Sequence, residues 1–115
     1  MEISLASPDI TAKTPQMFSH VVFFWTDPDK PEAADAVIAA GNKFLKSIPG
    51  STHFHIGKMA GSHRPVVDQS YQVGLNIGFT SKQAQDDYQA HPQHLEFVEQ
   101  CMKSLVKKVL VYDFE

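Results

Sequence analysis

The sequence predicts an α+β fold of the ferredoxin-like class, with strands and helices in the order β-α-β-β-α-β. Four short segments are rich in β-branched and aromatic residues, two segments between them carry apolar residues at helical spacing, and Pro and Gly mark the boundaries. In this class the four strands form one antiparallel sheet and both helices cover one of its faces. We expect residues 17–115 to form this domain and residues 1–16 to be a flexible arm, with a short strand around Ile3 as the alternative.

The first strand is predicted over residues 17–25, which are dominated by aromatic and β-branched side chains. Strand alternation separates these side chains into two sets. One set is His20, Val22 and Phe24, and the other is Val21, Phe23 and Trp25. Because both sets are largely apolar, we expect both faces of this strand to be covered.

The first helix is predicted to begin near Pro31, with Asp29 as its cap, and to end at Pro49-Gly50. One apolar stripe at helical spacing supports it. The stripe consists of Ala34, Val37, Ile38, Gly41, Phe44, Leu45 and Ile48.

Two more strands are expected over residues 51–59 and 71–79, joined by a loop that contains Gly61 and Pro65. In the first of them His53 and His55 share a face, because they lie two residues apart. The other strand alternates large apolar residues with small or polar ones. The small or polar set is Gln72, Gly74, Asn76 and Gly78.

The second helical region is predicted to begin at the capping pair Thr80-Ser81 and to break at His91-Pro92. A residue before proline avoids the helical region, and proline is well suited to the first position of a new helix. We therefore expect the helix that begins at Thr80-Ser81 to end before Pro92 and a new helix to start at Pro92. The chain then ends in a strand over residues 106–114.

Apolar residues on both faces of the first and last strands predict a second copy of the chain as partner. Two helices on one face of the sheet would leave Val22, Phe24 and part of the last strand exposed on the other face. Large apolar patches are rare on monomers, and a two-fold homodimer is the usual way to cover one.

A cavity is predicted on the uncovered face, because small residues of the third strand leave room between two packed sheets. We expect a small, largely apolar ligand in this inter-sheet cavity or in a helix-lined one, bound by apolar walls with a few polar groups. The candidate binding residues are His20, Val22, Phe24, His53, His55, Asn76 and His91.

Composition argues against several classes of function. The net charge is −3, so no basic field is available for nucleic acid or an anionic membrane. Cys101 is the only cysteine, no basic and apolar leader precedes the domain, and no apolar run is long enough for a membrane span. We expect a cytoplasmic protein without a cofactor.

The chain resembles the stress-responsive A/B barrel (Dabb) domain family over residues 17–115. The resemblance rests on His20 before an apolar run, on Ile48-Pro49-Gly50, and on the closing Val111-Tyr112-Asp113-Phe114. Its most specific part is the motif Tyr88-x-x-His91-Pro92-x-His94-x-x-Phe97-Val98. The family has a dimeric α+β barrel, which agrees with the partner expected from the two-faced strands.

The resemblance also implies candidate catalytic residues. One family member is a polyketide cyclase that closes a ring by aldol condensation, and its catalytic tyrosine and histidine correspond to Tyr88 and His94. A pocket histidine on its first strand corresponds to His20. The Ala-rich first helix lacks that enzyme's aromatic pocket residues. The resemblance therefore does not imply the cyclase's substrate for this chain.

Other interpretations remain open from the sequence. His91 could cap a helix while Tyr88 and His94 serve packing alone. His20, His53 and His55 could form a zinc site, although no carboxylate or thiol supports it, and we expect no metal. A non-enzymatic stable dimer and a cofactor-free monooxygenase are the alternative functions, the second on shared architecture alone.

Overall fold

The computed structural model describes residues 17–115, so the predicted arm and the alternative strand at Ile3 lie outside the described residues. The elements follow the predicted β-α-β-β-α-β order, with the first helical region divided into two elements and the second into three. They are β1 (Phe18–Thr26), α2 (Ala33–Ala40), η1 (Gly41–Leu45), β2 (Ser51–Lys58), β3 (Val73–Phe79), α3 (Lys82–Ala90), α4 (Pro92–Phe97), η2 (Val98–Met102) and β4 (Val106–Phe114).

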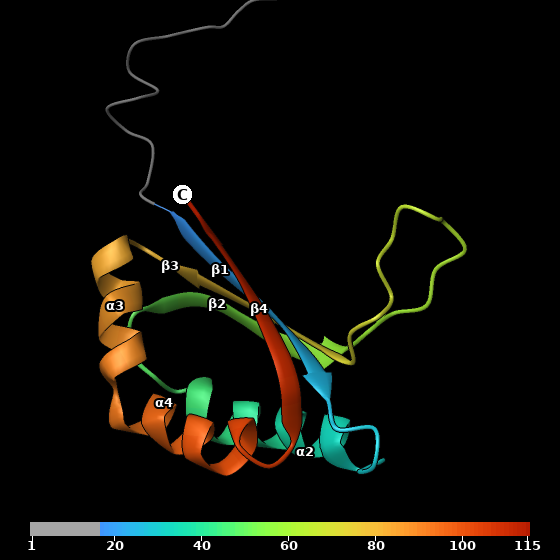
Figure 1. Cartoon of the computed structure of the whole chain (residues 1–115). Coiled ribbons are helices and arrows are strands. Elements are labelled where there is room, and N and C mark those ends of the chain that lie inside the picture. The colour runs from blue at the N-terminus through green and yellow to red at the C-terminus, as the bar shows by residue number, and fades with distance from the viewer. Residues whose placement is uncertain (1–16) are drawn as a thin grey trace, which may run out of the picture.

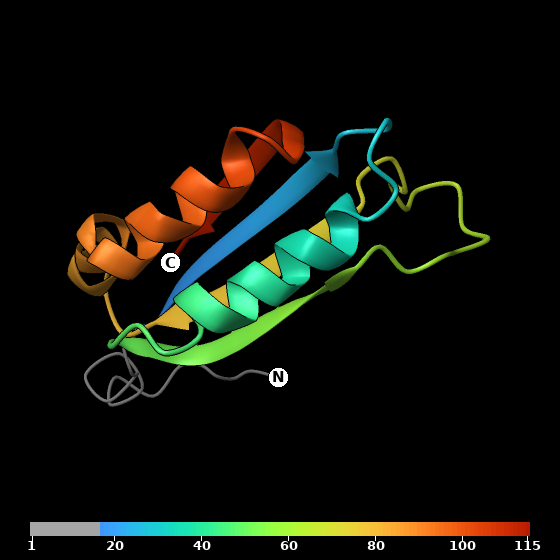
Figure 2. The same ribbon diagram turned by 90° about the horizontal axis from the view of Figure 1, so that it is seen from below.

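The four strands form one antiparallel sheet in the order β2-β3-β1-β4. The helices all lie on one side of this sheet, and the opposite side carries no helix (Figures 1 and 2). The loop between β2 and β3 projects away from the body of the domain (Figure 1). This arrangement confirms the ferredoxin-like α+β fold and leaves one sheet face open, as the sequence predicts.

The register between β1 and β3 shows which side chains face the helices. Val22 pairs with Leu75, and Val21 pairs with Asn76. Val22 and Leu75 are buried beneath the helices, whereas Asn76 is exposed on the open face. The prediction that Val22 and Phe24 share the uncovered face with Asn76 was therefore wrong.

The error has a simple physical cause. Alternation divides β1 into two sets of side chains, but both sets are apolar, so the local pattern cannot say which set the helices cover. The large residues of β3 must pack against the helices, and hydrogen-bonded pairing places His20, Val22 and Phe24 beside them. The open face instead receives Val21, Phe23 and Trp25.

The first helical region packs its predicted stripe onto the sheet. Val37, Leu45 and Ile48 are buried there. At the junction of α2 and η1, an added Cβ on Gly41 would lie 2.5 Å from the Ile56 Cδ1 atom. Any larger residue here would require the Ile56 side chain to shift. Asp29 is not the cap of α2, because the N-cap position is occupied by Glu32 without a side-chain hydrogen bond.

The second helical region begins and breaks where the sequence predicts. The Ser81 hydroxyl accepts a hydrogen bond from the Ala84 amide and caps α3. His91 has extended backbone angles, and its Nδ1 atom accepts a hydrogen bond from the Gln93 amide at 3.1 Å. Pro92 then occupies the first turn of α4. No helix among residues 17–115 has the length and apolar character needed to cross a membrane.

Candidate functional site

A cavity of about 350 Å³ lies between the sheet and the helices α3 and α4, which is the helix-lined one of the two positions that the sequence leaves open. Strands β1, β3 and β4 supply one wall, and the helical residues supply the other. The lining residues are His20, Val22, Phe24, Leu45, Leu75, Gln85, Tyr88, Gln89, His94, Phe97, Val98, Met102, Val109, Val111 and Asp113.

Five of the predicted site residues meet in this cavity. His20, Val22 and Phe24 reach it from β1, Tyr88 comes from α3, and His94 comes from α4. The tyrosine and histidine lie together because the break at His91-Pro92 turns α4 away from α3. Their rings are 4.8 Å apart between centroids.

The remaining predicted binding residues lie elsewhere. His53 and His55 pair with Gly78 and Asn76 and share the open face with them. His91 caps α4 and does not line the cavity. Placing His53, His55, Asn76 and His91 in one site with His20 was therefore wrong.

The three-histidine zinc alternative is also contradicted, because His20 lies on the helix-covered face and His53 and His55 lie on the other. Within residues 17–115, no group of three or more potential ligands among His, Cys, Asp and Glu is placed to hold a metal ion. The separation follows from strand geometry, because neighbouring residues of a strand point to opposite faces of the sheet and paired residues point to the same face. His20 pairs with Ile77, whose neighbour Gly78 pairs with His53.

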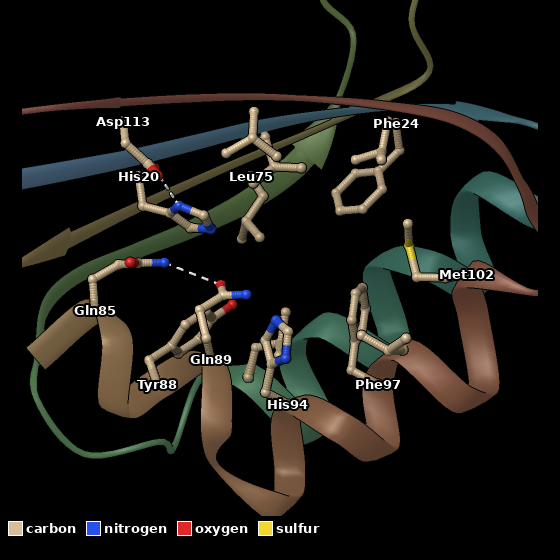
Figure 3. Close-up of a pocket in the computed structure, with 15 residues that line it drawn as sticks. His20, Phe24, Leu75, Gln85, Tyr88, Gln89, His94, Phe97, Met102 and Asp113 are labelled. Carbon is tan, nitrogen blue, oxygen red and sulfur yellow. Dashed lines mark hydrogen bonds and ion pairs between the residues drawn. The ribbon is translucent and has the colours of Figure 1, made fainter.

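His20 is held by Asp113 of the edge strand β4. The His20 Nδ1 atom lies 2.6 Å from the Asp113 Oδ1 atom, and the histidine is 5% exposed. A carboxylate can only accept here, so in the neutral form of the ring the proton lies on Nδ1 and the other ring nitrogen is an acceptor. That nitrogen points into the cavity (Figure 3). The pair thus presents an oriented proton acceptor.

Tyr88 is 2% exposed and lies among aromatic rings of the same site. Its ring centroid is 5.1 Å from that of Phe79 and 5.8 Å from that of His20. Burial raises the pKa of the Tyr88 hydroxyl well above its usual range. The hydroxyl therefore remains protonated at neutral pH and can donate a hydrogen bond to a ligand oxygen.

His94 is the least satisfied polar side chain of the cavity. Its Nδ1 atom is buried and has no hydrogen-bond partner among residues 17–115. Burial lowers the pKa of His94 below the ordinary value of 6.5, and the neighbouring His20 ring lowers it further whenever that ring carries a proton on both nitrogens. His94 is therefore neutral at physiological pH, which is the form that can accept a proton.

The cavity has a polar end and an apolar end (Figure 3). The polar end is formed by His20, Gln85, Tyr88, Gln89, His94 and Asp113. The apolar end is formed by Phe24, Phe97 and Met102 (Figure 3). Such an arrangement suits a molecule with polar groups at one end and an apolar remainder.

Sequence reasoning missed Asp113, Gln85 and Gln89. Asp113 could have been found by parity, because it continues the alternation of Val109 and Val111 on β4. Gln85 lies three residues before Tyr88, and therefore on the same helix face. A polar residue beside the motif tyrosine was the available signal.

Comparison with solved structures places this fold among ferredoxin-like proteins. A Dabb family protein from Mesorhizobium loti is 27% identical, with a TM-score of 0.70, over 86% of this chain and 95% of that chain. A hydroxynitrile lyase from Passiflora edulis is 18% identical, with a TM-score of 0.72, over 87% of this chain and 93% of that one.

A third solved structure is a dimeric protein of unknown function from Bacteroides fragilis. It is 18% identical, with a TM-score of 0.67, over 86% of this chain and 95% of that one. Likeness at 18% identity shows the shared fold alone. A search of curated proteins found no sequence that matches this chain.

The sequence pattern of the Stress responsive A/B Barrel Domain matches residues 18–115, which is most of the chain. The matched region contains every element of the sheet, both helical regions and the whole cavity. The chain therefore belongs to the stress-responsive A/B barrel (Dabb) domain family.

Proposed function

We propose that this Dabb protein forms a homodimer and binds a small, largely apolar carbonyl compound in the cavity, where His94 and Tyr88 carry out acid-base chemistry. The observation that carries the proposal is the neutral His94 beside a buried tyrosine hydroxyl, at one end of an otherwise apolar cavity. A neutral imidazole and a neutral phenol are the forms that a proton abstraction beside a carbonyl requires.

The reaction we propose is an intramolecular aldol addition, the ring-closing step of a polyketide-cyclase type of reaction. His94 removes a proton from the carbon beside a ligand carbonyl, and Tyr88 donates a hydrogen bond to the enolate oxygen that forms. The enolate carbon attacks a second carbonyl of the same molecule, forming one carbon–carbon bond. The new alkoxide then takes the proton from His94, which returns the residue to its neutral form.

Two features of the site support these roles. Preorganised donors act most strongly in a water-poor site, and Tyr88 is almost fully buried. The His20–Asp113 pair presents a second oriented acceptor on the opposite wall of the same cavity. A hydroxynitrile lyase with the same fold supports enzymatic chemistry on this architecture in general.

The test is turnover of synthetic poly-β-keto compounds by the wild type and by the variants His94→Gln and Tyr88→Phe. Removing a general base or an oxyanion donor lowers rates by roughly 10²–10⁴-fold. Gln83→Ala is the control, because Gln83 lies on the exposed side of α3 and outside the cavity. Turnover rates equal to the wild-type rate in both variants would contradict the roles proposed for His94 and Tyr88.

A non-enzymatic dimer is the alternative, and the solved relatives described as proteins of unknown function leave room for it. Wild-type protein that binds such compounds without converting any of them would favour this alternative. The cytoplasmic location and the absence of a cofactor stay predictions.

The homodimer is supported by the apolar character of the open sheet face. Phe23 and Tyr71 pack edge to face there with centroids 4.8 Å apart, and Tyr112 and Phe114 of β4 are 54% and 60% exposed. Aromatic residues are enriched in protein interfaces, and a patch of this kind is rarely left uncovered. Dimeric relatives of the same fold support the same conclusion.

Light scattering of wild-type protein should give twice the 12.8 kDa mass of one chain. Tyr112→Glu should shift the mass toward that of one chain, because it places a charge in the proposed interface. Leu95→Glu is the matched control, since Leu95 is 57% exposed on α4, away from the open face. A wild-type mass of one chain at micromolar concentrations would contradict the homodimer.

A further inference from the structure

Two glutamines on one face of α3 border the polar end of the cavity. Gln85 and Gln89 lie one helical turn apart, and the Gln85 Nε2 atom donates a hydrogen bond to the Gln89 Oε1 atom at 3.0 Å. Gln85 is only 5% exposed, whereas Gln89 is exposed where the cavity meets the surface. Figure 3 shows both side chains directed into the space between His20 and Tyr88.

This pair has hydrogen-bonding capacity that the protein itself does not use. Each primary amide carries two N–H donors and one carbonyl acceptor. Their mutual bond uses one donor and one acceptor, and no other group among residues 17–115 hydrogen-bonds to the two side-chain amides. Reversing both amides would leave the same total. At least one donor and one acceptor therefore face the cavity together.

Folding alone does not account for these residues. The unused amide groups of Gln85 are not cut off from solvent, because among residues 17–115 only His94 Nδ1 is a buried side-chain polar atom without a partner. Leucine would still pack against the apolar walls at similar volume. The same spacing occurs in the exposed Gln83–Asp87 pair, so the spacing by itself does not explain why Gln85 lies against the cavity. The unused donor and acceptor are therefore available to a ligand.

The charge of the cavity defines that ligand further. Its lining contains no Lys or Arg, and its one carboxylate, Asp113, is paired with His20. A ligand carboxylate or phosphate would be desolvated here near the Asp113 carboxylate, without a permanently charged side chain to pair with. The polar group of the ligand is therefore uncharged.

We propose that Gln85 and Gln89 form a specificity subsite that selects ligands with a neutral group able both to donate and to accept a hydrogen bond, such as a primary amide or an enol beside a carbonyl, attached to an apolar tail. The proposal rests on the proposed small-molecule function of the cavity and names the polar group it recognises. The two glutamines are specificity residues and take no part in proton transfer.

Three probes of matched length test the subsite. Hexanamide donates and accepts, 2-heptanone only accepts, and hexanoate is charged. Binding is measured by NMR titration of wild-type protein, following the side-chain amide signals of glutamines in ¹⁵N-labelled protein. We expect hexanamide to bind about tenfold more tightly than either other probe, as the loss of one or two hydrogen bonds implies.

The variant Gln85→Leu/Gln89→Leu should remove this preference and bind 2-heptanone at least as tightly as hexanamide. Gln89→Leu alone is the second variant, because an exposed residue tolerates replacement and the fold is retained. Gln83→Leu is the matched control. It removes the 2.9 Å hydrogen bond from Gln83 to Asp87, which has the same spacing on α3 but lies outside the cavity. This variant should keep the wild-type preference for hexanamide.

A wild-type protein that prefers hexanoate, binds none of the probes, or keeps its preference for hexanamide in the double variant would overturn the subsite. The acid-base proposal fails separately. If His94→Gln leaves turnover unchanged while the amide preference is lost only in the glutamine variants, the subsite stands and the catalytic assignment falls.

Discussion

The two faces of the sheet are built from the same strands but meet different surroundings. On the covered face, Val22, Phe24 and Leu75 are at most 5% exposed, and the polar residues His20 and Asp113 are bonded to each other. On the open face, large aromatic side chains are only partly covered, and His53, His55 and Asn76 lie among them, exposed. Burial by the domain's own helices creates a site with altered proton affinities, whereas the open face has the character of a contact surface.

The sharpest test of this contrast uses two adjacent phenylalanines of β1. Phe24 is 2% exposed on the covered face, and Phe23 is half-buried on the open face. Phe24→Ala should lower the free energy of unfolding by about 3–5 kcal/mol, because a cavity forms in a closed core. In dilute protein, Phe23→Ala should lower the free energy of unfolding by about half as much as Phe24→Ala.

Urea unfolding at two protein concentrations measures both losses. The loss in Phe23→Ala should grow with protein concentration, because part of its contacts would come from a second copy. Equal losses for the two variants at low concentration would mean that the two faces are buried alike within one chain.

A second test concerns the close contact between helix and sheet on the covered face. Gly41→Ala should lower the free energy of unfolding by about 1–3 kcal/mol, because the new methyl would overlap the Ile56 side chain. Gly61→Ala, in the loop where an added Cβ meets nothing within 4 Å, should change it by no more than about 0.5 kcal/mol. Thermal unfolding of both variants checks the difference, and a Gly41 variant as stable as the wild type would show that the contact can relax.

The smallest expected effect is the pH dependence that His94 adds to stability. Its pKa is lowered in the folded protein, so the unfolded chain binds a proton more readily. The stability that depends on neutral His94 should therefore be fully present at pH values above the ordinary pKa of 6.5, and it should be lost as the pH falls below that value. Because His94 is only partly buried, we expect a contribution below the roughly 1.4 kcal/mol that one pKa unit represents.

Unfolding of the wild type and of His94→Gln between pH 8 and pH 5 measures this contribution. The variant should lose less stability than the wild type on acidification. A wild type that becomes more stable relative to the variant as the pH falls would mean that the folded protein favours the charged imidazole, and that His94 is not the base we propose.

The contrast between the faces also shows which structural features could be predicted from the sequence alone. The order of elements, the cap at Ser81, the helix break at His91-Pro92 and the bounds of β4 were all predicted, because caps, proline and propensity act within a few residues. The motif likewise brought Tyr88 and His94 to notice, and the structure places both in one cavity.

Only the tertiary structure decided which face of β1 the helices cover. Alternation gives two sets of side chains, and on β1 both sets are apolar, so the choice depends on pairing with β3, fifty residues further along the chain. A second long-range pairing, between β1 and β4, brings Asp113 to His20. The sequence by itself determined the elements and the residues that could react; the sheet register determined where they meet, because hydrogen-bonded pairing between distant strands is not encoded in any local pattern.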